Sequence, residues 1–177
     1  MTNNLIFEGR CWKFGDDVSN DDGLMDRTFF RSRIFDAKAL APHVLEPLSP
    51  AFAKDAQAGD VIVAGQRFCH GNPHPQGCMG LKQRGVAAIV ESVQNTPYRL
   101  MVTMGVAFLP FAKGVTKLVN DGDHVRLNVA TGLFENLTSG KAETYEPLPE
   151  FLIDIISTGG SKDHVQKRLV EAGKIPA

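Results

Sequence analysis

Two short, fully apolar runs rich in β-branched residues constrain the fold of this chain more than any other feature. Val61–Ala64 and residues 86–90 each follow a glycine within two positions. Runs this short and this apolar are typical of strands that are buried on both faces of a sheet. Between them, residues 78–84 predict a short helix that ends at Gly85. We therefore expect a strand–loop–helix–strand unit with two parallel strands and a right-handed crossover.

The flanking sequence extends this unit on both sides. A helix over 99–104 and a strand over 106–109 predict a second unit of the same kind. Residues 124–129 alternate polar and apolar side chains, which predicts a half-buried antiparallel strand. Further expected elements are a strand over 5–14, a short helix within 36–45, a hairpin of 133–137 with 141–145, a helix over 150–157 and a helix over 162–172 with Ser161 as its N-cap. Together they predict an α/β or α+β domain.

Length and charge narrow the classes of function. A chain of 177 residues corresponds to about one domain of roughly 150 residues. The net charge of −1 gives no overall positive field, so we expect no nucleic-acid partner. The longest run without a charged residue or histidine, residues 100–112, is shorter than the roughly 20 apolar residues of a membrane span. No signal peptide is visible, and three cysteines do not make a disulfide framework, so a reducing cytoplasm is the expected location.

The loop over residues 68–78 is the most unusual stretch. It follows a predicted buried strand, and ligands in α/β sheets bind at the carboxyl ends of strands. Gly71 would let the backbone approach a ligand, Asn72 offers an amide, and His70 and His74 offer imidazoles. Two interpretations stay open. In one, the loop binds a carboxylate or phosphate and a histidine acts as acid or base. In the other, proline fixes the loop and the histidines are only surface residues.

The same loop contains a set of zinc-type ligands. Cys69, His70, His74 and Cys78 supply two thiols and two imidazoles, the types that tetrahedral zinc takes. Their spacing does not match the familiar zinc fingers, so we rank structural zinc as a minor alternative. A nucleophilic pair of Cys69 with His74 ranks lower still, because no third orienting group is identifiable.

An acidic segment, residues 16–26, precedes a group of arginines. Val18 and Phe29 occupy the positions where an EF-hand needs carboxylates, which argues against calcium and favours a solvated surface loop. Taken alone, the arginines are surface charges or a carboxylate clamp. They are Arg27, Arg31 and Arg33.

Several motifs in collinear order resemble isopropylmalate dehydratase small subunits, of the aconitase swivel-domain superfamily. They cover nearly the whole chain: residues 9–22 (GRCWKFGDDVSNDD), 52–54 (FAK), 59–65 (GDVIVAG), 136–141 (NLTSGK) and 146–152 (EPLPEFL). The resemblance implies one swivelling β/β/α domain over 1–177, like the fourth domain of aconitase. It would have a mixed sheet, flanking helices and a helical tail from about residue 150. It also implies an aconitase-like large subunit that carries a [4Fe–4S] cluster.

The active-site motif of the family is altered in this chain. The family has Gly-Ser-Ser-Arg-Glu after the central strand, where the first serine is the base and the arginine binds a substrate carboxylate. Here residues 71–75 read Gly-Asn-Pro-His-Pro. Asn72 stands at the serine position, and an amide is not a base. His74 stands at the arginine position, from which it would bind a carboxylate or take over as base.

Other family positions are partly kept. Arg27 matches the arginine that follows the acidic segment, and Arg99 falls where the family often has another arginine. The later motif Ser-Phe-Ala-Arg reads Ser-Val-Gln-Asn at 92–95, so that arginine is lost. The resemblance thus assigns catalysis to His74 or His70, and substrate binding to Arg27, Gly71, Asn72 and Arg99, with no metal held by this chain.

These residues support two main hypotheses. The first is a dehydratase subunit that works with an iron–sulfur large subunit on a small hydroxy di- or tricarboxylic acid, with the cluster acting as Lewis acid. The second is a paralogue that kept the fold and lost the base, and that acts as a binding or regulatory subunit. A zinc-binding domain ranks third.

Overall fold

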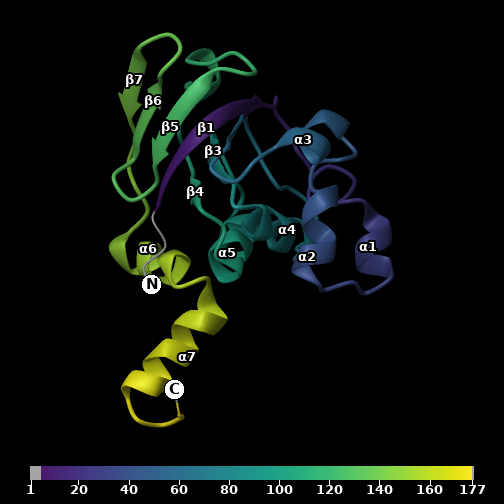
Figure 1. Ribbon diagram of the computed structural model, residues 1–177, viewed down its shortest axis with the longest axis vertical. Helices are drawn as coiled ribbons and strands as arrows, with labels where there is room; N and C mark the ends of the chain where they lie inside the picture. Colours follow the sequence, from purple (N-terminus) through teal and green to yellow (C-terminus); the bar gives the residue numbers. More distant parts are fainter. Residues whose placement is uncertain (1–4, 177) are drawn as a thin grey trace.

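The fold is built on one seven-stranded mixed sheet with the order β4-β3-β2-β1-β5-β6-β7 (Figure 1). The computed structural model describes residues 5–176. The strands are β1 (Ile6–Lys13), β2 (Val61–Ala64), β3 (Ala87–Val90), β4 (Phe108–Leu109), β5 (His124–Asn128), β6 (Leu133–Asn136) and β7 (Lys141–Thr144). The helices are α1 (Arg27–Arg31), α2 (Ala37–Leu40), α3 (Pro50–Asp55), α4 (Gln76–Arg84), α5 (Asn95–Met104), α6 (Glu150–Ser157) and α7 (Ser161–Glu171), with 3₁₀ turns at Ala41–His43 and Val115–Lys117.

The predicted strand–loop–helix–strand unit is confirmed. Strands β2 and β3 are buried along their whole length and pair in parallel, with Val61 opposite Ala87. Helix α4 begins two residues earlier than expected and ends at Gly85, whose φ of 72° is left-handed. The second unit is also present, because α5 ends at Gly105 and leads into β4, parallel to β3. Helix α4 lies between α2 and α5.

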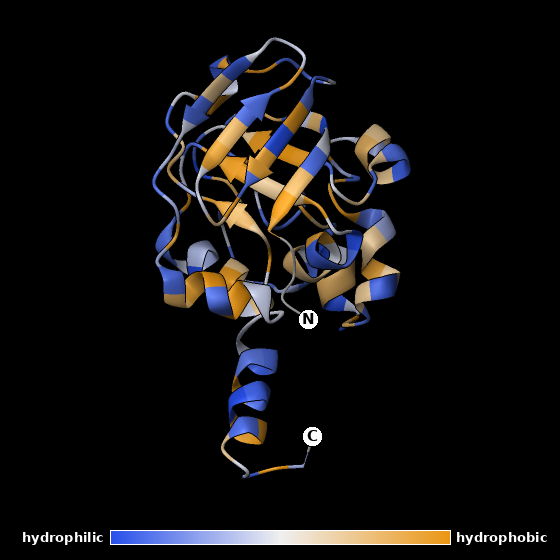
Figure 2. Cartoon of the chain, turned by 60° about the vertical axis from the view of Figure 1, so that its left-hand side comes forward, coloured by the Kyte–Doolittle hydropathy of each residue, from blue (hydrophilic) through white to orange (hydrophobic). Residues whose placement is uncertain are grey.

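Strand β1 lies at the centre of the sheet, where the pairing of neighbouring strands changes from parallel to antiparallel. On one side it pairs in parallel with β2, and on the other it pairs antiparallel with β5. Strand β5 shows the predicted alternation of burial, and β6 and β7 form the predicted hairpin, whose outer strand β7 is fully exposed. The sheet is therefore apolar on both faces at its parallel end and half-solvated at the other, which the strand colours in Figure 2 reflect.

A buried carboxylate, Asp60, joins β1 to the start of β2. It is 6% exposed and accepts hydrogen bonds from the backbone N–H of Arg10 (2.9 Å), the indole N–H of Trp12 (2.8 Å) and the backbone N–H of Gln57 (3.0 Å). Three donors from two separate segments thus converge on one side chain. The pairing of the two central parallel strands depends on this residue as well as on their ladder.

The C-terminal helices follow the sequence prediction except at one cap. Helix α7 extends away from the sheet (Figure 1), has no buried residue and is mostly hydrophilic (Figure 2). Ser161 does not cap it: the N-cap is Gly160, whose φ is 105°. A Cβ at Gly160 would lie 2.4 Å from the carbonyl oxygen of Thr103, so the close approach to α5 requires glycine there. Within residues 5–176, no helix is long and apolar enough to cross a membrane.

Candidate active site

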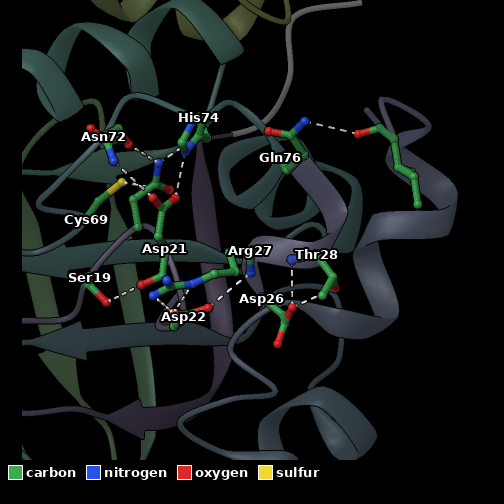
Figure 3. Close-up of polar contacts among 12 residues, drawn as sticks. Ser19, Asp21, Asp22, Asp26, Arg27, Thr28, Cys69, Asn72, His74 and Gln76 are labelled. Carbon is green, nitrogen blue, oxygen red and sulfur yellow. Dashed lines mark hydrogen bonds and ion pairs between the residues drawn. The ribbon is translucent and has the colours of Figure 1, made fainter. Parts of the chain in front are cut away.

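Two loops at the same edge of the sheet form the candidate site (Figure 3). Because β1 and β2 are parallel, the acidic segment after β1 and the loop after β2 both begin at the carboxyl edge. Backbone hydrogen bonds join them directly: Asn20 N–H donates to the carbonyl of His70 (2.7 Å), and His70 N–H donates to the carbonyl of Val18 (3.3 Å). The loop after β2 therefore lies at the carboxyl edge of the sheet, as predicted, and the acidic segment packs against it.

Asn20 fixes the backbone of the altered motif. Its side chain is buried, and its amide donates to the carbonyl oxygens of Asn72 (2.6 Å) and His74 (2.8 Å). Its amide oxygen accepts the thiol of Cys69 at 3.7 Å. The acidic segment was expected to be a solvated surface loop. That expectation is wrong for part of the segment, because Val18, Leu24 and Met25 are buried as well.

His74 is held on two sides. Its Nδ1 lies 2.8 Å from Oδ1 of Asp21, and its ring stacks on Phe30 with 3.7 Å between centroids and 9° between planes. The amide of Asn72 donates to the other oxygen of Asp21 at 3.3 Å. The side chains of His74 and Asp21 are 33% and 20% exposed, so the imidazole is oriented but still reaches solvent. An oriented, accessible imidazole is the arrangement that general acid–base chemistry needs.

Arg27 is placed beside the site but is bound to a carboxylate of this chain. It opens α1, directly after the N-cap Asp26, and its guanidinium forms an ion pair with Asp22 (Figure 3). The side-chain hydrogen bond from Arg27 is the main cause that lowers the pKa of Asp22. A pair of the same kind joins Arg67 to Asp17, and it likewise lowers the pKa of that carboxyl.

The remaining predicted site residues are placed differently. His70 lies in the same loop, with Nε2 3.2 Å from the carbonyl oxygen of Asp17. Gly71 has a φ of 101° and open space where a Cβ would lie, so its backbone conformation, and not crowding, calls for glycine. Arg99 is exposed on α5, and no hydrogen bond or ion pair within residues 5–176 links it to the two loops.

The zinc hypothesis finds no support in this geometry. Among the described residues, no group of three or more histidine, cysteine or acidic side chains is arranged to hold a metal ion. His70 and His74 are directed to Asp17 and Asp21, whereas the thiol of Cys78 contacts Cys69 in the interior. Three of the four candidate ligands lie in the loop and Cys78 lies on α4, and the four do not converge on one point.

We expect the cysteines to be unreactive in the folded protein. Burial raises the pKa of Cys11 to about 12, and the contact with Cys69 together with burial raises the pKa of Cys78. Because the thiolate is the reactive form, iodoacetamide at pH 8 should label neither residue until urea is added. Intact-mass spectrometry over a time course measures this. Rapid labelling of the native chain at Cys11 or Cys78 would contradict the packing described here.

Replacing Asn20 should loosen the motif loop. In Asn20→Ala the carbonyls of Asn72 and His74 lose their donor, which should lower the free energy of unfolding by about 1–3 kcal/mol. Urea unfolding measures the loss, and amide hydrogen exchange over residues 70–75 should become faster. Asn136→Ala is the matched control, because that buried amide also donates twice, to Leu118 and Asp123. It should destabilise the chain without changing exchange in the loop.

Sequence reasoning missed two residues of this site, Asp21 and Phe30. Asp21 belongs to an acidic run whose sequence favours a solvated loop, and Phe30 carries no functional signal of its own. Nothing in the local sequence marks either one, because their partner His74 is 53 residues away from Asp21 in the chain. The only signal in the sequence is that each loop follows a strand of the same parallel pair, whose carboxyl ends meet at one edge of the sheet.

The fold matches that of a dehydratase of known structure. A solved structure of 3-isopropylmalate dehydratase from Methanocaldococcus jannaschii superimposes with a TM-score of 0.81 at 30% identity, covering 96% of this chain and 99% of the other. No protein-family model matches the chain.

The names of several curated relatives identify the family within this class of dehydratases. The isopropylmalate/citramalate isomerase small subunit of Methanocaldococcus jannaschii is 33% identical over 94% of this chain and 98% of its own length. The 3-isopropylmalate dehydratase small subunit 1 of Thermotoga maritima is 35% identical over 92% and 96%. The methanogen homoaconitase small subunit of Methanothermobacter thermautotrophicus is 34% identical over 93% of each. This chain belongs to the family of isopropylmalate dehydratase small subunits.

Proposed function

We propose that this chain is the small subunit of an iron–sulfur-dependent hydro-lyase that dehydrates or isomerises a small hydroxy di- or tricarboxylic acid. By their names, the homologous chains are subunits of enzymes for isopropylmalate or citramalate, or of a homoaconitase. Each is named a small subunit, which implies a larger partner. The three free thiols fit a reducing cytoplasm. Within this class, the altered loop argues for an acid other than isopropylmalate.

One observation carries the proposal: an oriented imidazole stands where the family has an arginine. Dehydration removes a proton from one carbon and the hydroxyl from its neighbour, and the electron pair of the broken C–H bond forms the double bond. His74, held by Asp21 and Phe30, is the group in this chain that takes the proton. His70 is the second candidate. In the reverse direction the protonated imidazole returns the proton.

The other loop groups would hold the substrate. The amide of Asn72 and the backbone around Gly71 face the same edge and would orient a carboxylate or hydroxyl. Arg27 would bind a carboxylate by exchanging Asp22 for the substrate, which preserves a guanidinium–carboxylate pair. Arg99 stays a weaker candidate, because only its position in the family pattern points to it.

A [4Fe–4S] cluster does not fit the residues of this chain. No group of suitable ligands converges among residues 5–176, and Cys11 lies on β1, away from the loop that holds Cys69. We assign the cluster to the large subunit, where it would supply Lewis acidity to the departing hydroxyl.

A non-catalytic regulatory subunit is the alternative, and one observation favours it. Both arginines nearest the site, Arg27 and Arg67, are already paired with carboxylates of the acidic segment. Arginines that are already paired with aspartates of the same chain attract a dianionic substrate less strongly than unpaired ones. In this reading the chain would assemble with a large subunit and support no turnover.

The two functions are separated by one experiment. The chain is co-expressed anaerobically with a large subunit encoded in the same genome, and the complex is assayed against malate and citrate analogues. Turnover that disappears on iron chelation and returns on reconstitution supports the hydro-lyase. A stable complex that has no activity on any acid supports the regulatory alternative. The large subunit alone is the control for background activity.

A further inference from the structure

Asp21 differs from the other carboxylates of the acidic segment. Asp17 and Asp22 each form an ion pair with an arginine, and their side chains are 52% and 40% exposed. Asp21 is 20% exposed and faces no arginine in any of its hydrogen bonds; its partners are His74 and Asn72. The segment thus pairs two of its five aspartates with arginines and directs Asp21 into the site, beside the imidazole (Figure 3).

The position of Asp21 is fixed by its neighbours. The hydroxyl of Ser19 donates to the backbone carbonyl of Asp21 at 2.7 Å. The adjacent Asn20 holds the backbone carbonyl of His74 at 2.8 Å, so two consecutive residues bind the backbone and the ring of the same histidine. Phe30 covers one face of that ring and opposes its rotation. The distance between carboxylate and imidazole is therefore set by the fold.

The chemistry of the pair selects one tautomer. A carboxylate only accepts hydrogen bonds, so Nδ1 of His74 must carry the proton that it donates to Asp21. The lone pair of the neutral ring then lies on Nε2, which has no hydrogen bond within the described residues. We propose that Asp21 is the positioning residue of the site, which fixes His74 in the Nδ1–H tautomer and leaves Nε2 as the proton acceptor. This inference rests on the proposed hydro-lyase function.

The tautomer is tested first, on the full chain alone. Nitrogen-15 NMR distinguishes a protonated ring nitrogen from one with a lone pair, and the spectrum of His74→Gln identifies the signals of His74 among the five histidines. In the unmodified chain at neutral or alkaline pH, Nδ1 should carry the proton. In Asp21→Asn both tautomers should be populated. A ring that is protonated at Nε2 in the unmodified chain would overturn the proposal, whatever the activity of the complex.

Kinetics of the assembled complex are the second test. Asp21→Asn should lower kcat by about ten- to a hundred-fold, less than loss of a general base, with KM unchanged. A merely structural role would raise KM as well, because the loops also carry the substrate-binding groups. Asp154→Asn is the matched control: it alters a carboxylate beside Nδ1 of His164, 3.5 Å away on the C-terminal helices, and should leave both constants unchanged.

The outcomes separate this inference from the function on which it rests. If the Asn variant does not assemble, Asp21→Glu keeps the acceptor but displaces it, and should keep the Nδ1–H tautomer with a smaller fall in kcat. An active complex whose kcat is unaffected by either variant would refute the role of Asp21. A complex without turnover would refute the hydro-lyase function, while the tautomer measurement on the chain alone still tests the geometry.

Discussion

His74→Gln should reduce kcat of the assembled complex by about 10²- to 10⁴-fold, the contribution that a positioned general base typically makes. Glutamine keeps a donor for Asp21 and much of the side-chain volume, so the loop should retain its backbone bonds to Asn20. What it lacks is a nitrogen that can take up a proton. The measurement is steady-state turnover on the best substrate of the acid panel, with assembly checked by gel filtration.

Two other histidines define how specific that loss is. His124→Gln is the remote control, because that imidazole pairs with Glu8 on the exposed face of the sheet and should leave turnover unchanged. His70→Gln tests the second candidate base and should cost less than ten-fold, a small part of the roughly 10²-fold or greater effect of a true base. If His70 proves essential and His74 dispensable, the catalytic assignment passes to His70 and the role given to Asp21 is wrong.

Asp60→Ala should be the most destabilising single substitution among the polar residues described. It removes the common acceptor of Arg10, Trp12 and Gln57 and leaves three donors without a partner where β1 meets β2. Removal of one side of a buried polar network typically costs about 3–5 kcal/mol. Urea unfolding should show a lower midpoint with the same slope. Asp55→Ala is the control, since that side chain is exposed nearby and should change stability by less than about 0.5 kcal/mol.

The parallel half of the fold could be predicted from sequence because its signals are local. Gly85 and Gly105 end helices by adopting left-handed conformations, and the apolar runs on either side are too short to be anything but buried strands. The hairpin and the alternation of β5 are equally local. Ser161 failed as a cap because the neighbouring Gly160, pressed against α5, already provides the turn.

The site could be located but not assembled from sequence. That the loop with His74 and Asn72 follows a buried strand could be predicted from the sequence, whereas Arg27 is a candidate only through the family resemblance. The partner of His74 could not be identified, because which of the five aspartates of the acidic segment faces the ring depends on the left-handed residues Asp17 and Asp22 and on the hydrogen bonds of Asn20. Residues other than glycine seldom adopt this left-handed backbone conformation, because it is sterically unfavourable, and composition does not reveal where they do.

The central position of β1 has a consequence for biosynthesis. Its antiparallel partner β5 lies 114–122 residues further along the chain, from the pair of Arg10 with His124 to the pair of Ile6 with Asn128. At a translation rate of about 5–20 residues per second, roughly 6 to 24 seconds separate the synthesis of the two strands. During that interval β1 can pair only with β2, and one of its edges stays open on the ribosome. Strand β1, the first of the seven strands in chain order, therefore gains its second partner only after β2, β3 and β4 have been made, and that edge stays unpaired until synthesis reaches Asn128.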